Sequence, residues 1–376
     1  MVVAGEASGD EYGGRLVRAI RARMPSVRFF GMGGPAMRQA GVHLLHRATH
    51  RASIGFVESM KDLPSYRRLL LRLAEAARRL SPNVCVLIDF PGFNLRLGPL
   101  VRRLGVPVVY YIVPAVWAWG QGRAHQVASF AERVLCAYEF EVPLYERAGA
   151  RARWVGHPLL DDVPERVPTE QARIELGLDP QAGPVVALLP GSRTQEVERL
   201  LPVMLQAAGL ARLQLPDLRF VVSIAPGLTE SYVRSVAGRL ASLPAVRWVG
   251  GSIWSALGPA DFAVVASGTA TLQTALWGIP MVVVYKLSSA TYHLARRLVR
   301  LSHISLPNIV AGAPLVEEYL QAQAEPGRLA GAIVGYVRDA HRLQAMRERL
   351  GVIRARLGEP GAAERAADAV LEVMRP

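Results

Sequence analysis

The sequence predicts an α/β fold with two domains, each built on a parallel β-sheet. Short apolar runs rich in β-branched residues alternate along the chain with longer stretches of helical periodicity, a pattern typical of βα units. A proline-containing stretch at residues 161–169 separates two similar sets of these units. With 376 residues, of which 51% are hydrophobic, the chain is long enough to bury two cores. We therefore expect one domain over residues 1–160 and a second over 161–344.

The first set of units contains the pattern of an open sheet with helical crossovers. We expect strands at residues 2–4, 27–30, 84–88, 106–112 and 133–137, and helices at 12–23, 64–80, 97–104 and 143–148. The second set repeats this pattern. We expect strands at 185–189, 218–224, 246–249, 262–266 and 281–285, and helices at 196–208, 230–240 and 270–276.

The tail of the chain is expected to be helical at 338–350 and 362–374, with a break at the Gly-Glu-Pro-Gly sequence of residues 358–361. Ala363, Ala366, Ala367, Val370 and Met374 recur at helical spacing, so the last helix must pack on a partner surface. That surface belongs to either domain or to a second chain. We expect residues from about 345 onwards to pack back on the first domain, with a homodimer through this region as the alternative.

Composition excludes several classes of protein. Cys85 and Cys136 are the only cysteines, so no disulfide framework is expected, which suits a reducing, cytosolic compartment. The sequence has no apolar run of spanning length, and its first residues lack the basic and apolar regions of a signal peptide. We therefore expect neither a secreted, nor a membrane-spanning, nor a fibrous protein.

The basic charge is concentrated in the first part of the chain. The formal net charge is +13, but residues 1–160 hold 22 basic and 11 acidic side chains, whereas residues 161–376 hold 22 and 20. All the basic residues except Lys61 and Lys286 are arginines, which indicates a compositional bias as well as a function. An excess of this kind favours nucleic acid, anionic membrane or acidic substrates as partners.

Two loops in the first domain could carry chemistry. The sequence Ala-Gly-Glu-Ala-Ser-Gly-Asp at residues 4–10 joins the first strand to a helix, where glycines let the backbone approach a ligand. It could equally be an ordinary turn with Ser8 or Asp10 capping the helix. Asp89 directly follows a buried strand, a position from which a carboxylate can act as general base at the edge of a parallel sheet. Its alternative role is to form the turn before Pro91, and Asn94 is as well explained by structure as by binding.

Two loops in the second domain have features of anion sites. In Pro-Gly-Ser-Arg at 190–193, the backbone amides and the Arg193 guanidinium can bind an anion; the alternative is a loop with a solvated arginine. Ser267, Gly268 and Thr269 begin another helix after a strand, where they either bind phosphate or merely cap the helix. Two such loops together favour a diphosphate ligand. The sequence has neither the dinucleotide fingerprint nor the P-loop signature.

The stretch from Ile54 to Leu80 combines apolar and cationic residues. A helix over 64–80 has one apolar stripe and several arginines on the rest of its surface. The favoured interpretation is a core-facing stripe with solvated arginines; the alternative is membrane contact, which the apolar residues upstream would extend. The stripe consists of Tyr66, Leu69, Leu70, Leu73, Ala76, Ala77 and Leu80, and the upstream residues are Ile54, Phe56, Val57 and Met60.

At these loops the chain resembles the lipid-A-disaccharide synthase family, bacterial glycosyltransferases of lipopolysaccharide assembly. The resemblance rests on motifs in family order along nearly the whole chain: AGEASGD at 4–10, IDFPGFN at 88–94, VWAW at 116–119, VGHP at 155–158, LLPGSR at 188–193, ASGTATLQ at 266–273 and SLPN at 305–308. It implies a GT-B architecture, in which two Rossmann-like domains face a cleft and a C-terminal helix crosses back. The implied reaction joins UDP-2,3-diacylglucosamine to 2,3-diacylglucosamine 1-phosphate, with inversion, to give the lipid A disaccharide 1-phosphate and UDP. No cofactor is expected, and no metal, in keeping with the lack of a ligand cluster at His43, His46 and His50.

The resemblance also assigns roles. It implies that Asp89 is the general base and that the second domain stabilises the leaving UDP. Gln273 stands where the family usually carries glutamate, a residue expected to hold the ribose. The expected donor-binding residues are Gly191, Ser192, Arg193, Ser267, Gly268, Thr269, Gln273 and Asn308, and the expected acceptor-binding residues are Gly5, Glu6, Ser8, Gly9 and Asn94.

Other functions remain open at this point. One is another UDP-sugar enzyme of GT-B fold, either an N-acetylglucosaminyltransferase or an epimerase, and another is a non-catalytic sugar-nucleotide binder. Nucleic-acid binding is not expected, because the arginines lie along helices without interleaved aromatic residues. We expect a cytoplasmic protein, peripheral on the inner face of the cytoplasmic membrane, with acylated sugar substrates.

Overall fold

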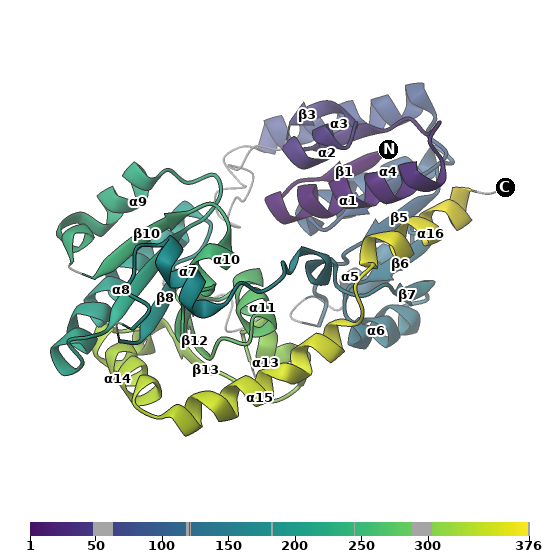
Figure 1. Ribbon diagram of the computed structural model, residues 1–376. Coiled ribbons are helices and arrows are strands. Elements are labelled where there is room, and N and C mark those ends of the chain that lie inside the picture. Colours follow the sequence, from purple (N-terminus) through teal and green to yellow (C-terminus); the bar gives the residue numbers. More distant parts are fainter. Residues whose placement is uncertain are drawn as a thin grey trace. The chain divides into compact units, whose positions relative to one another are not determined.

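The chain folds into two compact units, each with its own parallel sheet (Figure 1). The computed structural model describes residues 1–47, 63–117, 120, 122–181, 183–243, 245–287 and 303–374. The first unit comprises Met1–Asp161 and Leu357–Pro376, and the second comprises Asp162–Arg356. Some features expected from the sequence lie outside the described residues: the apolar group at Ile54, Phe56, Val57 and Met60, His50, and positions 118–119 of the VWAW motif.

The sheet of the first unit has the order β3-β2-β1-β4-β5-β6-β7 over the described residues, and its ladders are parallel. The first strand lies inside the sheet, so the chain winds outward from it in both directions. The strands are β1 (Val2–Ala4), β2 (Phe30–Gly33), β3 (His43–Arg47), β4 (Cys85–Ile88), β5 (Val108–Tyr111), β6 (Arg133–Cys136) and β7 (Ala152–Trp154).

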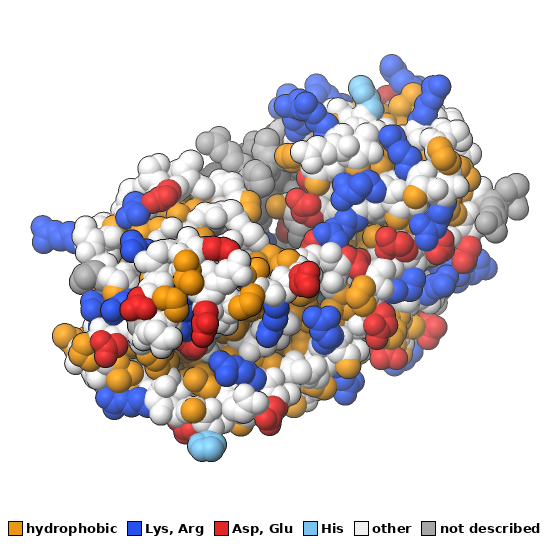
Figure 2. Space-filling view, viewed as in Figure 1, with side chains coloured by type: hydrophobic (Ala, Val, Ile, Leu, Met, Phe, Trp, Pro, Cys, Tyr) orange, Lys and Arg blue, Asp and Glu red, His pale blue; other side chains and the backbone are white. Residues whose placement is uncertain are grey.

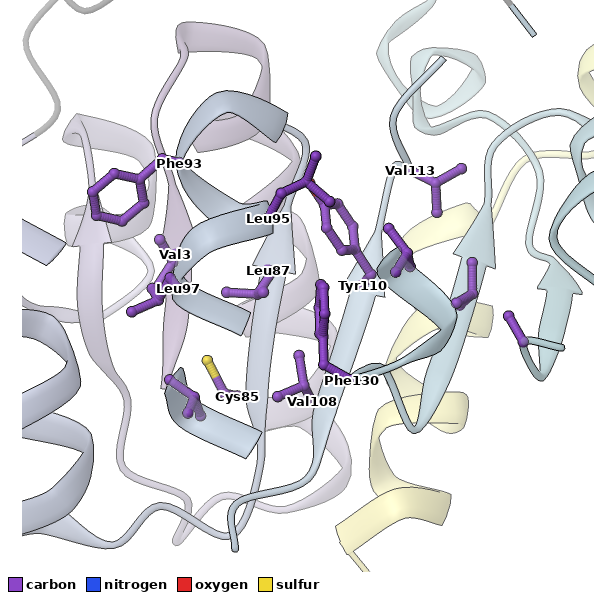
Figure 3. Close-up of a cluster of buried hydrophobic side chains, with 14 of the residues drawn as sticks. Val3, Cys85, Leu87, Phe93, Leu95, Leu97, Val108, Tyr110, Val113 and Phe130 are labelled. Carbon is purple, nitrogen blue, oxygen red and sulfur yellow. The ribbon is translucent and has the colours of Figure 1, made fainter. Parts of the chain in front are cut away.

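Helices cover both faces of this sheet, and a separate hydrophobic core lies under each cover. Figure 3 shows part of one core, in which Phe93, Leu95 and Leu97 of α4 lie over Leu87 and neighbouring strand residues. Helices α3, α4 and α5 contribute to that core, and α1, α2 and α16 to the other. Their bounds are α1 (Ala7–Arg23), α2 (Pro35–Gln39), α3 (Leu63–Leu80), α4 (Pro91–Arg103), α5 (Gly122–Ala128), η3 (Glu139–Glu141), α6 (Val142–Arg147), η4 (Pro158–Asp162) and α16 (Ala362–Met374), where η marks a 3₁₀ helix.

The last helix completes the first unit. Helix α16 packs along α1, and the apolar stripe expected from the sequence is buried at Ala363, Ala366, Ala367 and Val370. The side chain of Asp161 accepts a hydrogen bond from the Gly361 amide at 2.6 Å, where the chain re-enters the unit. The stripe is therefore covered by the same chain, and a homodimer through this region stays a prediction.

The second unit has the sheet order β10-β9-β8-β11-β12-β13 over the described residues, again with parallel ladders. Its central strands are buried throughout, as continuous apolar runs in a doubly covered parallel sheet require. The strands are β8 (Val185–Leu189), β9 (Arg219–Ile224), β10 (Val246–Gly250), β11 (Phe262–Ala266), β12 (Met281–Tyr285) and β13 (Glu317–Leu320). The helices are α7 (Thr169–Glu175), α8 (Thr194–Gln214), α9 (Glu230–Ala237), η5 (Gly238–Ser242), α10 (Ile253–Leu257), α11 (Thr269–Leu276), α13 (Leu306–Ala311), η6 (Gln321–Gln323), α14 (Pro326–Val337) and α15 (Ala340–Leu357).

Among the strands, the sequence patterns missed those with exposed or charged residues. The missed strands are β3, β7 and β13, each at an edge of its sheet, so their residues do not form buried apolar runs. His43 and His46 lie on β3. Helix α4 begins at Pro91, six residues before the expected start, because proline is well suited to the first helical position.

The amphipathic helix α3 uses most of its apolar stripe in the core. Leu73 and Ala77 are buried, and Tyr66, Leu69 and Leu70 pack against the same cluster. The outer surface carries Leu71 and Leu80, which are 54% and 56% exposed, among arginines. Within the described ranges, no helix is both long and apolar enough to cross a membrane.

Part of the basic charge of the first unit is balanced by ion pairs. Glu132 lies within 3.2 Å of Arg102 and 3.0 Å of Arg151, and Glu75 lies 2.8 Å from Arg78 and 2.6 Å from Arg79. On the visible surface in Figure 2, Asp and Glu side chains occur among the Lys and Arg side chains of both units. Such exposed pairs contribute little to stability.

Candidate functional site

The candidate residues follow the strands at which each sheet reverses its direction of winding. In the first unit, β1 and β4 are neighbours with Ala4 opposite Ile88, so the loop from Gly5 and the turn at Asp89 leave the sheet side by side. In the second unit, β8 and β11 are neighbours with Leu189 opposite Val265. The loops at 190–193 and 267–269 therefore also leave one edge together. In open α/β sheets, ligands bind outside the carboxyl ends of strands at such reversal points.

Asp89 occupies a strained and tightly fixed turn. Asp89 and Phe90 both have left-handed backbone conformations, with φ of 46° and 48°. The carbonyl oxygen of Asp89 accepts hydrogen bonds from Asn94 Nδ2 at 2.7 Å and from the Tyr110 hydroxyl at 2.9 Å. Consecutive non-glycine residues in this conformation persist only where the surroundings hold them, and they are typical of functional sites.

Asn94 supports the Asp89 turn through hydrogen bonds. Its side chain is fully buried, and Nδ2 also donates to the Ile88 carbonyl at 3.2 Å. Its Oδ1 is buried and has no hydrogen-bond partner among the described residues. The structure thus places Asn94 as a support of Asp89, while the expected contact with the acceptor stays a prediction.

Several buried titratable groups lie in the same part of the first unit as Asp89. Burial raises the pKa of Tyr12 and that of Tyr138, and the nearby charge of Asp89 raises both further. Burial also raises the pKa of Glu141 to about 8, and Asp89 contributes to this rise. His157, whose ring lies 5.2 Å from that of Tyr138, has its pKa lowered by burial to about 4. Because of these shifts, Tyr12, Tyr138, Glu141 and His157 are mostly uncharged at neutral pH.

The loop after β1 passes directly over the Asp89 turn. A Cβ atom at Gly5 would lie 2.2 Å from the ring of Phe90, so only glycine allows this approach. Glu6 and Ser8 are half-buried at the start of α1, and Gly9 is buried against Ala4 and Ile88. The four predicted acceptor residues of this loop therefore lie next to Asp89 within one unit.

Asp10, the last residue of the AGEASGD motif, has a different role from the one considered in the sequence. It caps α2 rather than its own helix: its buried carboxylate accepts hydrogen bonds from the amides of Gly34 at 2.6 Å, Ala36 at 2.9 Å and Met37 at 3.0 Å. The motif thus links the first two βα units as well as forming the loop.

In the second unit, the 190–193 loop already holds an anionic group. The carboxylate of Glu196 accepts hydrogen bonds from the amides of Ser192 at 3.1 Å and Arg193 at 3.3 Å, and from the Arg193 guanidinium at 3.3 Å. Gly191, with φ of 110°, lets this carboxylate sit against the backbone, since a Cβ there would lie 2.4 Å from Glu196 Oε2. The loop can therefore bind an anion at these donors, and a diphosphate using the same amides has to displace Glu196.

The 267–269 loop presents polar groups at the start of α11. Ser267 and Gly268 are half-buried and Thr269 is exposed, and no side chain caps this helix. The hydroxyl of Ser267 donates to the Ile304 carbonyl at 3.4 Å. Gln273 is partly exposed one turn further along the helix. These positions suit contacts with a nucleotide at the positive end of a helix.

Asn308 supports the same site through a buried network. Its side chain pairs with Glu318, with the Val316 carbonyl and amide and with the Leu315 amide, at 2.7–2.9 Å. Glu318 in turn accepts hydrogen bonds from the amides of Ile304 and Ser305. Asn308 thus holds the loop that contacts Ser267, and its predicted contact with the donor stays a prediction.

Sequence reasoning missed three carboxylates near the site: Glu141, Glu196 and Glu318. Glu196 offered a signal, since it stands three residues after Arg193 in the capping-box position. Glu141 and Glu318 offered none, because burial beside distant strands is a property of the fold. Over the described ranges, no group of three or more His, Cys, Asp or Glu side chains is arranged to hold a metal ion.

Comparison with known proteins shows one family match over nearly the whole chain. The LpxB family model, described as lipid-A-disaccharide synthetase, matches residues 1–373. The lipid-A-disaccharide synthase of Trichlorobacter lovleyi is 42% identical over 375 residues, covering 100% of this chain and 97% of the relative. That of Myxococcus xanthus is 41% identical over 376 residues, with the same coverage.

Solved structures support the predicted fold class. A UDP-GlcNAc 2-epimerase from Neisseria meningitidis, solved with UDP-GlcNAc, has a TM-score of 0.68 at 9% identity and covers 99% of this chain and 98% of its own. A glycosyltransferase from Rickettsia africae has a TM-score of 0.57 at 11% identity, covering 100% and 97%. At these identities the likeness concerns the fold alone, and it confirms the GT-B class. With parallel sheets in both units, loops at their winding reversals and a family match over residues 1–373, the chain belongs to the lipid-A-disaccharide synthase family and is a glycosyltransferase.

Proposed function

We propose that the enzyme joins UDP-2,3-diacylglucosamine to 2,3-diacylglucosamine 1-phosphate, with Asp89 as the general base. The observation that carries this proposal is the Asp89 turn: a carboxylate at a winding reversal, held in a left-handed conformation by hydrogen bonds from Asn94 and Tyr110. A base fixed in this way can be aligned with one hydroxyl of a bound sugar.

The reaction needs one proton transfer and one displacement. The Asp89 carboxylate takes the proton of the acceptor's primary hydroxyl while that oxygen attacks the anomeric carbon of the donor. The bond between the anomeric carbon and the β-phosphate oxygen breaks on the opposite side, so the configuration inverts and UDP leaves with the additional negative charge. This single displacement requires no second carboxylate as nucleophile.

In this proposal, the second unit stabilises the leaving UDP. The amides and guanidinium that now hold Glu196 are donors suited to a diphosphate, and the start of α11 adds further donors. We place the ribose near Gln273.

The assay that tests this function supplies the full-length protein with both acylated substrates. We expect UDP release together with a disaccharide 1-phosphate product, measured by mass spectrometry. UDP release without disaccharide, or release that does not depend on the acceptor, would contradict the proposed reaction.

The substitution Gln273→Glu tests the position of the ribose. A carboxylate accepts hydrogen bonds from hydroxyl groups more strongly than an amide does, so we expect UDP to bind about tenfold more tightly to the variant. Calorimetric titration with UDP measures the change. Gln195→Glu, which adds the same charge at the start of α8, is the comparison that detects a general electrostatic effect; equal changes in both variants would rule out a specific ribose contact.

We also propose that the enzyme binds the inner face of the cytoplasmic membrane through the region from Ile54 to Leu80. Within the described part of that region, the outer surface of α3 carries the exposed side chains of Arg67, Leu71 and Arg72. Cationic side chains beside an exposed apolar residue suit an anionic lipid surface, and both proposed substrates carry acyl chains.

Flotation with vesicles containing anionic lipid tests this surface. Each arginine near such a surface contributes about 1 kcal/mol, so R67A/R72A should reduce vesicle binding about thirtyfold. The variant R78A/R79A removes the same charge from the same helix, but its two arginines pair with Glu75, and we expect a smaller loss. Equal losses of vesicle binding in R67A/R72A and R78A/R79A would show that binding depends only on the total charge of the helix.

A further inference from the structure

Glu141 is a buried carboxyl group that the proposed reaction does not use. Its side chain is 2% exposed, and it lies in η3 just beyond the carboxyl end of β6. Oε1 accepts a hydrogen bond from the indole Nε1 of Trp117 at 3.0 Å, and Oε2 accepts one from the Tyr138 amide at 3.2 Å. The carboxyl thus joins the loop after β5 to the segment after β6.

Trp117 is one of a group of aromatic rings around this carboxyl. The rings of Trp117 and Phe140 meet edge to face at 5.8 Å, and those of Tyr138 and Phe140 stack at 5.3 Å. Tyr138 is buried, whereas Trp117 and Phe140 are half-exposed. Strand β5 lies between β4 and β6 in the parallel sheet, so Asp89, the loop that carries Trp117 and the segment that carries Glu141 all leave the same edge.

We propose that Glu141 is a positioning residue of the acceptor site: it fixes Trp117, and Trp117 with Phe140 forms an apolar wall beside Asp89 for the acceptor's sugar ring. This inference rests on the proposed function, because it takes Asp89 to mark where the acceptor hydroxyl reacts. Aromatic rings supply large rigid contact areas, and ligand pockets are lined mainly by such rings with a few placed polar groups. If the Trp117 indole rotated freely in the unbound enzyme, it would lose entropy on becoming ordered against the acceptor, and this loss would weaken acceptor binding.

Three variants test the contact. W117F keeps a ring but removes the N–H donor, and E141L removes both accepting oxygens. Each should raise the acceptor KM about tenfold, with donor KM and kcat close to wild type. Because both remove the same contact, the double variant should be no worse than either single one.

W154F is the matched control, because the indole Nε1 of Trp154 donates instead to the Ala137 carbonyl, at 3.1 Å. It should leave the acceptor KM unchanged. If W117F and E141L only lower the free energy of unfolding and keep a normal acceptor KM, or if their effects add in full, the inference is overturned. Failure of the proposed function looks different, since wild-type protein would then form no disaccharide.

The pH dependence provides a second readout. Burial raises the pKa of Glu141 to about 8, hydrogen bonds from Trp117 and from the backbone of Tyr138 and Ala137 oppose this rise, and the Asp89 charge adds to it. The other titratable groups facing it are Cys136 and Tyr138 at the end of β6 and Tyr145 on α6, and burial keeps all three protonated by raising their pKa values. Above pH 8, Glu141 therefore adds a second negative charge beside Asp89. The acceptor is itself anionic, so its KM should rise there in wild type but not in E141Q; parallel profiles would count against the inference.

Discussion

Asp89→Asn is expected to lower kcat by about 10² to 10⁴, the range in which a general base contributes. The amide cannot take the proton of the attacking hydroxyl, while the rest of the site stays in place. Asparagine is preferred to alanine because residue 89 has φ of 46°, a conformation that Asn and Asp adopt more readily than other side chains. Steady-state measurement of UDP release gives kcat, and calorimetry should show unchanged binding of UDP alone.

Glu139→Gln is the control for this prediction. Glu139 is exposed in η3, close in sequence to the groups around Asp89, so the control removes one negative charge from the same region. We expect nearly normal turnover. If Asp89→Asn retained full turnover, Asp89 would not be the base, although the family and the reaction would be unaffected.

Asp10→Ala is expected to lower the free energy of unfolding by about 3 kcal/mol or more, since it leaves three backbone amides at the start of α2 without their acceptor. Each buried amide left in this way costs about 1–3 kcal/mol. Urea denaturation followed by circular dichroism measures the loss. Asp10→Asn keeps the oxygen position that serves Gly34 and Met37, so it should lose less.

Glu11→Ala provides the comparison at the neighbouring position. Glu11 is exposed, and a surface substitution of this kind usually changes stability by less than about 0.5 kcal/mol. Similar losses in Asp10→Ala and Glu11→Ala would mean that the capping of α2 contributes little. A loss of activity in Asp10→Ala at full stability would instead point to a direct role in the site.

The buried central strands could be predicted well from the sequence, whereas three of the four edge strands, β3, β7 and β13, could not. The expected 185–189, 262–266 and 281–285 agree with β8, β11 and β12 at both ends, because parallel strands covered on both faces are continuous apolar runs. Strand β13, with the sequence Glu-Glu-Tyr-Leu, was missed because its residues are half-buried and two are charged. A pattern based on hydrophobicity detects the centre of a sheet before its edges.

For the site, the sequence predicted which loops matter but not what their side chains contact. Parallel topology alone brings Gly5 next to the Asp89 turn and the 190–193 loop next to the 267–269 loop, so these neighbourhoods could be expected. The buried hydrogen-bond partners of these loops could not be predicted from the sequence. Glu318 reaches the amides of Ile304 and Ser305 from a strand that follows them in the sequence, a contact that depends on side-chain packing.

The return of the last helix to the first unit has a consequence for the order of folding during translation. The second unit is one continuous segment, Asp162–Arg356, and can acquire its contacts once that segment has left the ribosome. The first unit begins to emerge earlier, but one of its two cores includes Ala363, Ala367 and Val370. The core that α1 and α16 share, in the domain synthesised first, therefore stays incomplete until α16 has been synthesised.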